Sequence, residues 1–365
     1  MKLKSQITKK SPEQLIRPEV QALSAYHVPD PGNLIKLDAM ENPYTWPEEM
    51  VQEWLEVLRD AAINRYPDPS AQQLSKSLRE AFAVPEGMQI LLGNGSDELI
   101  QMVAMAVAEK DRVILAPQPS FVMYEMIATF TGMQFVGVPL DKDDFSLDMV
   151  AMQQAIKEYQ PAVTFLAYPN NPTGNLFAED QVREIIEQAS GLVVVDEAYA
   201  AFAGHSFMAT LGEYDNLLVM RTVSKMGLAG LRLGLLAGPK QWLHEIDKVR
   251  LPYNINVLTQ KSAVFALKHK QVLDRQTKVI CEERERMFQQ LQKIEGIEPY
   301  PSQANFILFR CVDRDANEIF GSLREGGVLI KNMSAAGGVL VDCLRVTIGT
   351  PEENQCFLSI LQDKE

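Results

Sequence analysis

The chain has 365 residues, of which 46% are hydrophobic and 23% are charged; this is the balance of a folded protein of about two domains, not of a disordered chain. Acidic residues number 48 against 35 Lys and Arg, giving a formal net charge of -13, so we expect no general binding to nucleic acid. The four cysteines and four histidines show no metal-ligand or disulfide spacing, and no run reaches the roughly 18 apolar residues of a membrane span. We therefore expect a cytoplasmic protein without a metal site or a membrane partner.

The first 45 residues are rich in proline and loop-forming residues. We expect residues 1–45 to form an N-terminal arm together with a segment of a small domain. Helical spacing follows over residues 47–62 and 71–83. Ser70 is expected to cap the second helix, because serine is favoured at helix N-termini.

Short apolar runs without polar alternation come next, and most are followed by a loop and a helical pattern. Such runs are typical of strands buried on both faces, which indicates a mostly parallel sheet. We expect a large α/β domain over residues 46–260. The apolar runs lie at residues 90–92, 113–116, 163–167, 192–195 and 217–220.

After about residue 260 the pattern changes to long charged helices, over residues 257–267 and 271–293. Further strand patterns follow, which are expected to be antiparallel with helices on one face. This predicts a smaller α+β domain over residues 261–365. These strand patterns lie at residues 304–310, 327–331 and 343–348.

Polar residues follow several of the predicted strands, where an open α/β sheet binds its ligands. Residues 93–97 (Gly-Asn-Gly-Ser-Asp) lead into a predicted helix over residues 99–108. A glycine turn at a helix N-terminus offers free backbone N–H groups to a phosphate. Glu98 replaces the third glycine of a dinucleotide motif, and no Gly-Lys-Ser/Thr follows. A plain helix cap is the alternative for this segment.

Two more polar residues allow two interpretations each, and a third lies in a segment typical of a turn. Lys225 is either a solvated lysine or one whose ammonium is destabilised by burial and by Arg232, so that it forms a Schiff base. Asp196 either caps a helix or pairs with a cationic ring nitrogen, with Tyr199 one helical turn further on. Asn171 stands in Asn-Pro-Thr-Gly, which is typical of a turn.

Taken together and in this order, these motifs resemble those of the pyridoxal-phosphate-dependent aminotransferases of fold type I. The resemblance covers essentially the whole chain and is closest to the histidinol-phosphate aminotransferases. It implies an α/β fold in which a large domain with a mostly parallel central sheet flanked by helices joins a smaller α+β domain. The segments that carry it are 64–68 (Asn-Arg-Tyr-Pro-Asp), 95–98 (Gly-Ser-Asp-Glu), 196–199 (Asp-Glu-Ala-Tyr), 229–232 (Ala-Gly-Leu-Arg) and 343–350 (Cys-Leu-Arg-Val-Thr-Ile-Gly-Thr).

The resemblance implies that Lys225 binds pyridoxal 5'-phosphate covalently and moves the proton, while Asp196 pairs with the ring nitrogen. It further implies that Asn171 and Tyr199 hydrogen-bond the phenolic oxygen, and that Phe121 stacks on the ring. The residues that it assigns to the cofactor phosphate are Ser96 and Asp97 through their backbone, Thr222, Ser224, Arg232, and Tyr66 from the partner subunit of a homodimer.

The resemblance also implies the substrates, L-histidinol phosphate and 2-oxoglutarate, and hence a step of histidine biosynthesis. The amine carries a phosphate, whereas glutamate carries two carboxylates, so one site needs a cation that binds both. Arg345 is the candidate, because a guanidinium fork fits either anion. Tyr26 and Asn305 are expected to enclose the ligand. Lys331 stands where many relatives carry a second substrate arginine, and a lysine offers only a point charge.

Other functions on the same fold stay open at this point. A threonine-phosphate decarboxylase also binds a phosphorylated amine, and an aromatic amino-acid aminotransferase takes a related ring. A cofactor-binding regulator is a third class, but neither end of the chain has the spare length or basic charge of a DNA-binding domain.

Overall fold

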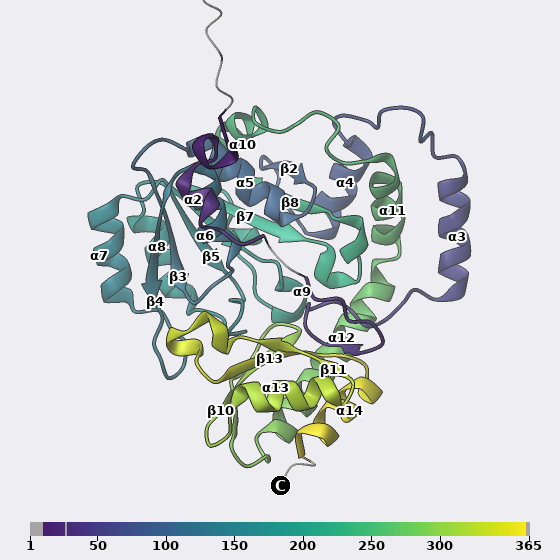
Figure 1. Ribbon diagram of the computed structural model, residues 1–365. Helices are drawn as coiled ribbons and strands as arrows, with labels where there is room; N and C mark the ends of the chain where they lie inside the picture. Colours follow the sequence, from purple (N-terminus) through teal and green to yellow (C-terminus); the bar gives the residue numbers. More distant parts are fainter. Residues whose placement is uncertain (1–9, 26–27, 363–365) are drawn as a thin grey trace, which may run out of the picture.

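The computed structural model describes residues 10–25 and 28–362, which form a larger and a smaller part (Figure 1). The larger part holds a seven-stranded sheet between helices, and the smaller part, at the bottom of Figure 1, holds a four-stranded sheet. Two parts of this kind, α/β followed by α+β, confirm the predicted architecture. The exact domain limits at residues 45 and 260 stay a prediction.

The seven-stranded sheet is mostly parallel, as predicted. Its strands are β2 (Gln89–Gly93), β3 (Val113–Gln118), β4 (Gln134–Pro139), β5 (Val163–Ala167), β6 (Leu192–Asp196), β7 (Leu217–Thr222) and β8 (Gly234–Gly238). They lie in the order β2-β8-β7-β6-β5-β3-β4, with β8 antiparallel to both neighbours. The sequence patterns did not predict β4 or β8. In the structure β4 is a partly exposed edge strand, and β8 begins and ends with glycine, which weakens a strand pattern.

The helices vary from single turns to long rods. They are α1 (Pro12–Leu15), α2 (Pro18–Gln21), α3 (Glu48–Arg59), α4 (Gln72–Ala81), α5 (Ser96–Val107), α6 (Met123–Thr131), α7 (Met149–Tyr159), α8 (Glu179–Gln188), α9 (Ala200–Ala203), α10 (Lys240–Asp247), α11 (Val257–Lys268), α12 (Lys270–Leu291), α13 (Ala316–Glu325) and α14 (Pro351–Gln362). Short 3-10 turns lie at Met208–Thr210, Ser224–Met226, Ala229–Leu231, Ser334–Ala336 and Gly338–Leu340. Within the described residues, no helix is both long and apolar enough to cross a membrane.

Alternate residues of the large sheet serve two separate cores. In β6, Val193 and Val195 pack in the core that includes α4, α7, α8 and α11. Leu192 and Val194 pack in the core that includes α5, α6 and α10. Because both faces are covered, each strand position carries an apolar residue, which explains the uninterrupted apolar runs.

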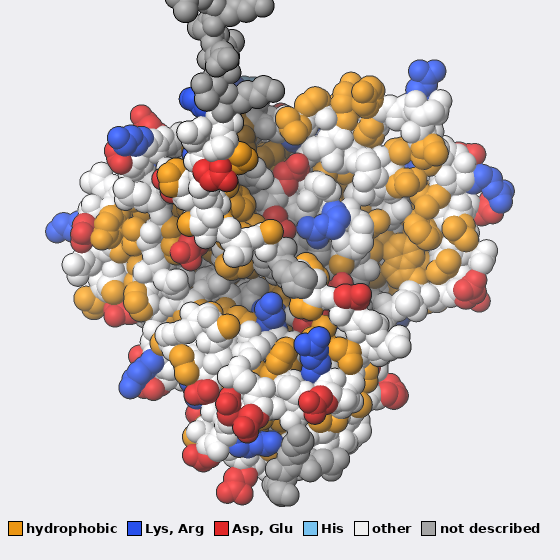
Figure 2. All heavy atoms as spheres, in the orientation of Figure 1, with side chains coloured by type: hydrophobic (Ala, Val, Ile, Leu, Met, Phe, Trp, Pro, Cys, Tyr) orange, Lys and Arg blue, Asp and Glu red, His pale blue; other side chains and the backbone are white. Residues whose placement is uncertain are grey.

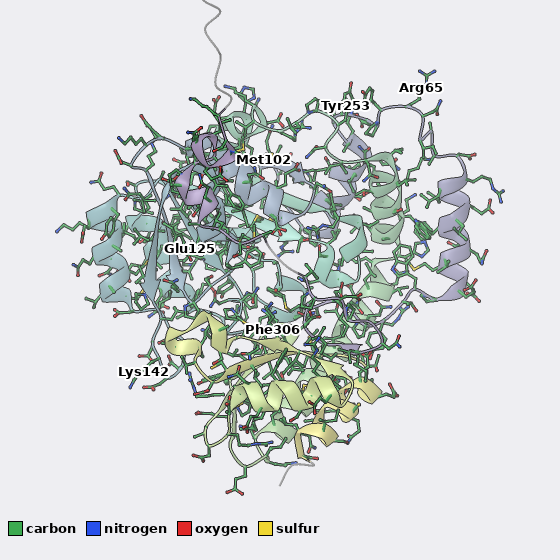
Figure 3. All side chains as sticks on the ribbon, viewed as in Figure 1. Arg65, Met102, Glu125, Lys142, Tyr253 and Phe306 are labelled. Atoms are coloured by element: carbon green, nitrogen blue, oxygen red, sulfur yellow. The ribbon has the colours of Figure 1, made fainter. Side chains whose placement is uncertain are left out.

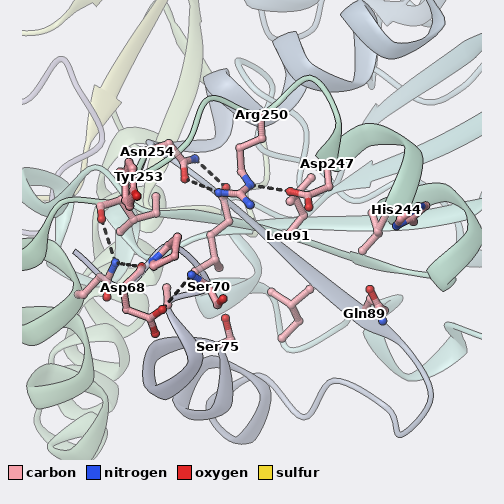
Figure 4. A pocket seen from close by; sticks show the side chains of 17 residues that line it. Asp68, Ser70, Ser75, Gln89, Leu91, His244, Asp247, Arg250, Tyr253 and Asn254 are labelled. Carbon is pink, nitrogen blue, oxygen red and sulfur yellow. Dashed lines mark hydrogen bonds and ion pairs between the residues drawn. The ribbon is translucent and has the colours of Figure 1, made fainter. Parts of the chain in front are cut away.

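Helix α4 begins differently from the prediction. Ser70 is not its cap: the helix begins at Gln72, after Ala71 in a left-handed conformation with φ of 44°. The Asp68 carboxylate accepts a hydrogen bond from the backbone N–H of Ser70 at 3.0 Å (Figure 4). It accepts another from the backbone N–H of Gln72 at 2.9 Å. Asp68 takes the role predicted for Ser70 because a carboxylate reaches two N–H groups of the turn at once.

The smaller part has an antiparallel sheet, as predicted, and one unexpected parallel pair. The antiparallel sheet has the order β12-β13-β10-β9 and comprises β9 (Ile297–Pro299), β10 (Phe306–Cys311), β12 (Lys331–Asn332) and β13 (Cys343–Thr347). The run at 327–331 is not one strand: β11 (Val328–Leu329) pairs in parallel with β1 (Ile35–Lys36) from the N-terminal segment, and Ile330 separates it from β12.

The two parts meet around β10 and α12. Phe306 of β10 is fully buried and lies where the two parts join, whereas Arg65 and Tyr253 lie on the far rim of the larger part (Figure 3). Acidic side chains gather on the smaller part, and hydrophobic side chains gather over α3 and α11, which pack against each other (Figure 2).

Candidate active site

A cavity of about 590 Å³ lies at the carboxyl ends of β5, β6 and β7. This is the edge at which a parallel sheet binds its ligands. Ten of the sequence-predicted site residues line it together with Met40, Ala167, Pro169 and Ala198. The ten are Ser96, Asp97, Phe121, Asn171, Asp196, Tyr199, Thr222, Ser224, Lys225 and Arg232.

A tight anion cradle forms one end of this cavity. Gly95 has φ of 91°, and a Cβ atom there would lie 2.7 Å from the Arg232 guanidinium. A Cβ at Gly234 would lie 2.8 Å from the backbone nitrogen of Ser96, the first residue of α5. Glycine at both places lets the guanidinium and the N-terminus of α5 approach one point, where the helix dipole also favours an anion. Arg232 contacts the Asp97 carboxylate at 3.4 Å and is half exposed.

Two hydroxyls beside the cradle fix the end of β7. The Thr222 Oγ1 donates to the Ser224 Oγ at 2.8 Å and accepts from the Ser224 backbone N–H at 3.1 Å. It also contacts the Leu233 carbonyl at 3.1 Å. This network ties the turn that carries Lys225 to the segment leading into β8.

Lys225 follows this turn and is partly buried. Its ammonium donates to the Ala39 carbonyl at 3.3 Å and lies 5.7 Å from the centre of the Tyr199 ring. Burial, together with the charges of Arg345 and Arg232, lowers the pKa of Lys225 to about 8. The predicted destabilisation by burial is thus present. Arg345, which had not been considered for this effect, contributes more than Arg232.

Asp196 ends β6 and is 4% exposed. Burial raises its pKa to about 7. Its carboxylate accepts a hydrogen bond from the Tyr124 hydroxyl at 2.8 Å and from the Ala198 N–H at 3.1 Å. A cation that faces a buried carboxylate stabilises its charged form, and a protonated ring nitrogen would be such a cation.

Tyr124 was missed as a site residue. It is fully buried in α6, stacks on Phe165 with ring centres 4.7 Å apart, and directs its hydroxyl at Asp196. Burial raises the pKa of Tyr124 well above its usual value, so it remains a donor. The available signal was that a buried tyrosine needs a partner for its hydroxyl, but no sequence pattern names that partner.

Tyr199, Asn171 and Phe121 surround the middle of the cavity. The Tyr199 ring packs edge-on against Phe306 at 5.2 Å, and burial raises its pKa. The Asn171 Oδ1 accepts a hydrogen bond from Arg345 at 2.5 Å. Phe121 lies edge-on to Tyr124 at 5.7 Å. An aromatic face, an amide and a phenol therefore stand around one space.

The smaller part reaches the cavity through Arg345, which is not among the lining residues but contacts one of them, Asn171. Arg345, on β13, is 6% exposed and donates to Asn171 and to the Asp38 carbonyl, the latter at 3.0 Å. Lys331 is its direct neighbour across the antiparallel pair β12–β13, so both side chains point to the same face of the sheet. Lys331 and Arg345 are the two predicted substrate cations, and the fold places them together.

Residues 38–40 form a segment across the cavity that sequence reasoning missed. Their carbonyl groups accept hydrogen bonds from three predicted site residues: Asp38 from Arg345, Ala39 from Lys225, and Met40 from Asn305 at 3.0 Å. The Met40 N–H donates to Thr347 at 3.0 Å, and φ of Met40 is 53°. This backbone positions three side chains at once, and backbone contacts leave no residue signature.

Five predicted site residues are not among those that line the cavity: Asn305, Lys331 and Arg345 of the smaller part, and Tyr26 and Tyr66. Tyr26 falls outside the described residues. Tyr66 does not line the cavity of its own chain; it is 79% exposed and stacks on Tyr253 with ring centres 4.5 Å apart. Its placement away from its own site is a condition for a role in a partner subunit.

The comparisons with known proteins agree with this geometry. Residues 32–361 match the family described as aminotransferase class I and II. The chain is 58% identical over 356 residues, 98% of its length and 99% of the relative's, to histidinol-phosphate aminotransferase 2 of Nitrosococcus oceani. It is 50% identical to the histidinol-phosphate aminotransferase of Chromobacterium violaceum, covering 96% and 98% of the two chains.

The chain belongs to the histidinol-phosphate aminotransferase family. Its fold is that of this family's solved structures. The enzyme from Clostridium acetobutylicum aligns with a TM-score of 0.83 at 25% identity, over 90% of this chain and 98% of that one. The enzyme from Sinorhizobium meliloti, solved in complex with pyridoxal-5'-phosphate, aligns with a TM-score of 0.84 at 22% identity, over 96% and 97%. The fold type I architecture predicted from the sequence is confirmed.

Membership of this aminotransferase family implies pyridoxal phosphate as the cofactor, and the residues present fit that group. The cradle at Gly95 and Arg232 has no room for a side chain on residue 95 and brings the guanidinium close to the backbone there. Asp196 is a buried carboxylate that faces the same cavity as an amine of lowered pKa, Lys225. The phosphate of this cofactor would meet the cradle, its ring nitrogen would meet Asp196, and its aldehyde would meet Lys225.

Proposed function

We propose that this chain exchanges the amino group between L-histidinol phosphate and 2-oxoglutarate, the reaction named for its relatives, with pyridoxal 5'-phosphate bound in the cavity. One observation carries the proposal: Lys225 and Asp196 line one cavity beside an anion cradle, with pKa values displaced to about 8 and about 7. Opposed shifts of an acid and a base in one cavity are what acid–base catalysis near neutral pH requires.

We assign the cofactor phosphate to the backbone N–H groups of Ser96 and Asp97, the hydroxyls of Thr222 and Ser224, and Arg232. Asp196 would pair with the ring nitrogen, while the Tyr124 hydroxyl donates a hydrogen bond to the Asp196 carboxylate. When bound, pyridoxal phosphate supplies an electron sink for the substrate's α-carbon. Asn171 and Tyr199 would hold the phenolic oxygen, and Phe121 would cover the ring face.

Lys225 would attach to the cofactor aldehyde and move the proton at the substrate. A pKa of about 8 leaves a useful share of its amine neutral near physiological pH, whereas an ordinary lysine is almost wholly protonated there. The Ala39 carbonyl, at 3.3 Å, would orient this amine toward the cavity.

We assign substrate binding to Arg345 and Lys331, with Asn305 and Tyr26 enclosing the ligand. Arg345 presents a buried guanidinium fork, and Lys331 lies beside it on β12. Carboxylate and phosphate both fit a fork. The point charge of Lys331 would favour the doubly charged phosphate by electrostatics alone, without bidentate geometry.

We further propose a homodimer in which Tyr66 of the partner subunit reaches the cofactor phosphate. Large apolar side chains are exposed near Tyr66, among them Ile63 at 76% and Leu251 at 72%, and hydrophobic atoms cover the α3 and α11 side (Figure 2). Patches of this kind mark interaction surfaces. The loop that carries Tyr66 is anchored by Gln260, which donates to the Asp68 carbonyl at 2.9 Å. A cytoplasmic location stays a prediction.

Hybrid dimers test the shared site. Tyr66→Phe and Lys225→Ala subunits, each nearly inactive alone, should regain about a quarter of wild-type activity when mixed and exchanged, since one site in each hybrid is complete. No recovery in dimers shown to be mixed by mass spectrometry would contradict the role of Tyr66 in the partner subunit.

The absorbance spectrum of the purified protein tests the function itself. With pyridoxal phosphate we expect a yellow band that histidinol phosphate alone removes and 2-oxoglutarate restores. A band that histidinol phosphate does not change would support the cofactor assignment but contradict the substrate assignment. Release of carbon dioxide from threonine phosphate would identify a decarboxylase instead, and the absence of any band would overturn the cofactor assignment.

A further inference from the structure

Behind the ends of β6 and β7 lies a buried ion pair that faces away from the cofactor cavity. Asp196 lines the cofactor cavity, Glu197 and Arg221 line a second cavity together with residues of α12, and Thr222 lines both. Successive side chains of a strand point to opposite sides. The pair therefore sits on the reverse side of two proposed cofactor residues.

The contacts of this pair are unusually complete. The Arg221 Nε and terminal nitrogen contact one Glu197 carboxylate oxygen at 2.8 and 2.7 Å. The Ser206 hydroxyl bonds to that oxygen at 2.8 Å and accepts from Arg221 at 2.6 Å. The Phe207 N–H donates to the other oxygen. Glu197 is fully buried at its side chain, and Arg221 is 14% exposed.

The pair links two strands at the point where both strands end. Backbone pairing of β6 with β7 stops at Asp196 and Met220, with one further bond from the Glu197 N–H to the Met220 carbonyl at 2.8 Å. Beyond this point Arg221 is followed at once by Thr222, and three residues later by Lys225. The side-chain bonds of Glu197 thus continue the pairing that the backbone no longer provides.

We propose that Glu197 and Arg221 are positioning residues, which hold Asp196 on β6 and Thr222, Ser224 and Lys225 after β7 in register for the cofactor. This inference rests on the proposed binding of pyridoxal phosphate. A buried ion pair contributes little net stability because the cost of desolvation offsets the attraction between the charges. A contribution to stability therefore does not by itself explain this pair. The Phe82 ring, 5.2 Å from the guanidinium, closes the other side of Arg221.

Arg183 offers a matched control. Its guanidinium also pairs with a glutamate, Glu213 at 2.8 Å, and lies 6.0 Å from a phenylalanine ring, that of Phe207. It stands on α8, away from the cofactor cavity. Arg183→Met also removes a glutamate pair and a ring contact without touching the ends of β6 and β7, at a more exposed place where Arg183 is 30% and Glu213 is 53% exposed.

The test measures affinity of apoprotein for pyridoxal phosphate by absorbance titration, at a temperature where circular dichroism shows every variant folded. Arg221→Met should weaken binding about tenfold, Arg221→Lys should recover part of that loss, and Arg183→Met should bind like wild type. The pH at which the absorbance band changes should also move in Arg221→Met alone.

Three outcomes would overturn the inference while the wild type binds the cofactor. They are unchanged affinity in Arg221→Met, an equal loss in Arg183→Met, and a lowered thermal midpoint with unchanged affinity and spectrum. If Arg221→Met does not fold, Arg221→Lys with wild-type affinity and spectrum would overturn it in the same way. Failure of the wild type itself to bind pyridoxal phosphate would instead refute the proposed function.

Discussion

The two sides of the cavity are built in different ways. One side consists of strand ends and the turns that follow them in the large sheet, and it carries Asp196, Thr222, Lys225 and the cradle at Arg232. On the other side, Met40 lines the cavity, and Arg345 contacts the lining residue Asn171 and the carbonyl of Asp38, so this side is built from opposite ends of the chain. The first side depends on sheet topology, and the second on how the smaller part packs against it.

This difference indicates which side of the cavity holds its residues more firmly in position. Parallel strands fix their carboxyl ends through a ladder of backbone bonds, so cofactor residues keep their positions whatever the substrate. The facing side is held by side-chain bonds to backbone carbonyls, such as Arg345 to Asp38, and these adjust more readily. We therefore expect mutations on the strand-end side to change the chemistry, and mutations on the facing side to change substrate preference.

Lys225→Ala should have the largest effect. Without the amine there is neither an attachment point for the cofactor nor a group to move the proton, so turnover should fall roughly 1,000-fold or more. Lys240→Ala, at the exposed start of α10, is the control. Near-wild-type steady-state rates in Lys225→Ala would remove the catalytic assignment.

Asp196→Asn should slow the first half-reaction roughly 100-fold or more, because a buried counter-charge is lost. The apoprotein provides a second readout. Native Asp196 keeps its proton up to about pH 7, while the unfolded residue loses it near the ordinary aspartate pKa of 3.8. The folded state thus binds the extra proton between these values, and wild-type stability falls as pH rises through this window.

Urea unfolding at pH 5 and pH 8 measures this difference. Wild-type apoprotein should lose about 3 kcal/mol relative to Asp196→Asn between the two pH values, because stability falls only from pH 5 to the native pKa of about 7 and these two pH units correspond to that free energy. Asp143→Asn, at an exposed position, should behave as wild type. Parallel pH profiles for wild type and Asp196→Asn would show that the carboxylate is not perturbed.

Arg345→Lys should raise KM for both substrates roughly tenfold or more, because the charge remains but the fork is lost, with little change in cofactor affinity. Arg345→Gln should in addition raise the pKa of Lys225, since the Arg345 charge lowers it, and move the pH–rate profile to higher pH. Steady-state kinetics from pH 6 to 10 separates the two. Equal profiles for the two variants would deny the electrostatic link.

Tyr124→Phe should have the smallest effect, a several-fold slower half-reaction. The variant loses the hydrogen bond that lowers the pKa of Asp196, which is worth about 1.5–3 kcal/mol for a charged acceptor. The stability window of Asp196 should then extend to higher pH. Tyr159→Phe, at the exposed end of α7, is the comparison, and identical unfolding profiles would refute the link.

The sequence alone predicted ten residues that the fold brings together around one cavity, while their roles toward a cofactor stay a prediction. Uninterrupted apolar runs indicated a mostly parallel sheet, and the polar residues after those runs, from Ser96 to Lys225, indicated a common site. That inference works because local patterns define strands, and parallel topology then places their ends together. The prediction for Ser70 was wrong because Asp68, two residues earlier, competes for the same N–H groups.

Only the tertiary structure decided the remainder. The hydroxyl of Tyr124 meets Asp196 across 72 residues of sequence, and Arg345 meets Asp38 across 307. The backbone carbonyls of residues 38–40 accept hydrogen bonds whose formation does not depend on which side chains these residues carry. Such contacts depend on packing between separate elements and on backbone groups common to all residues, so the order of the amino acids carries no local signal for them.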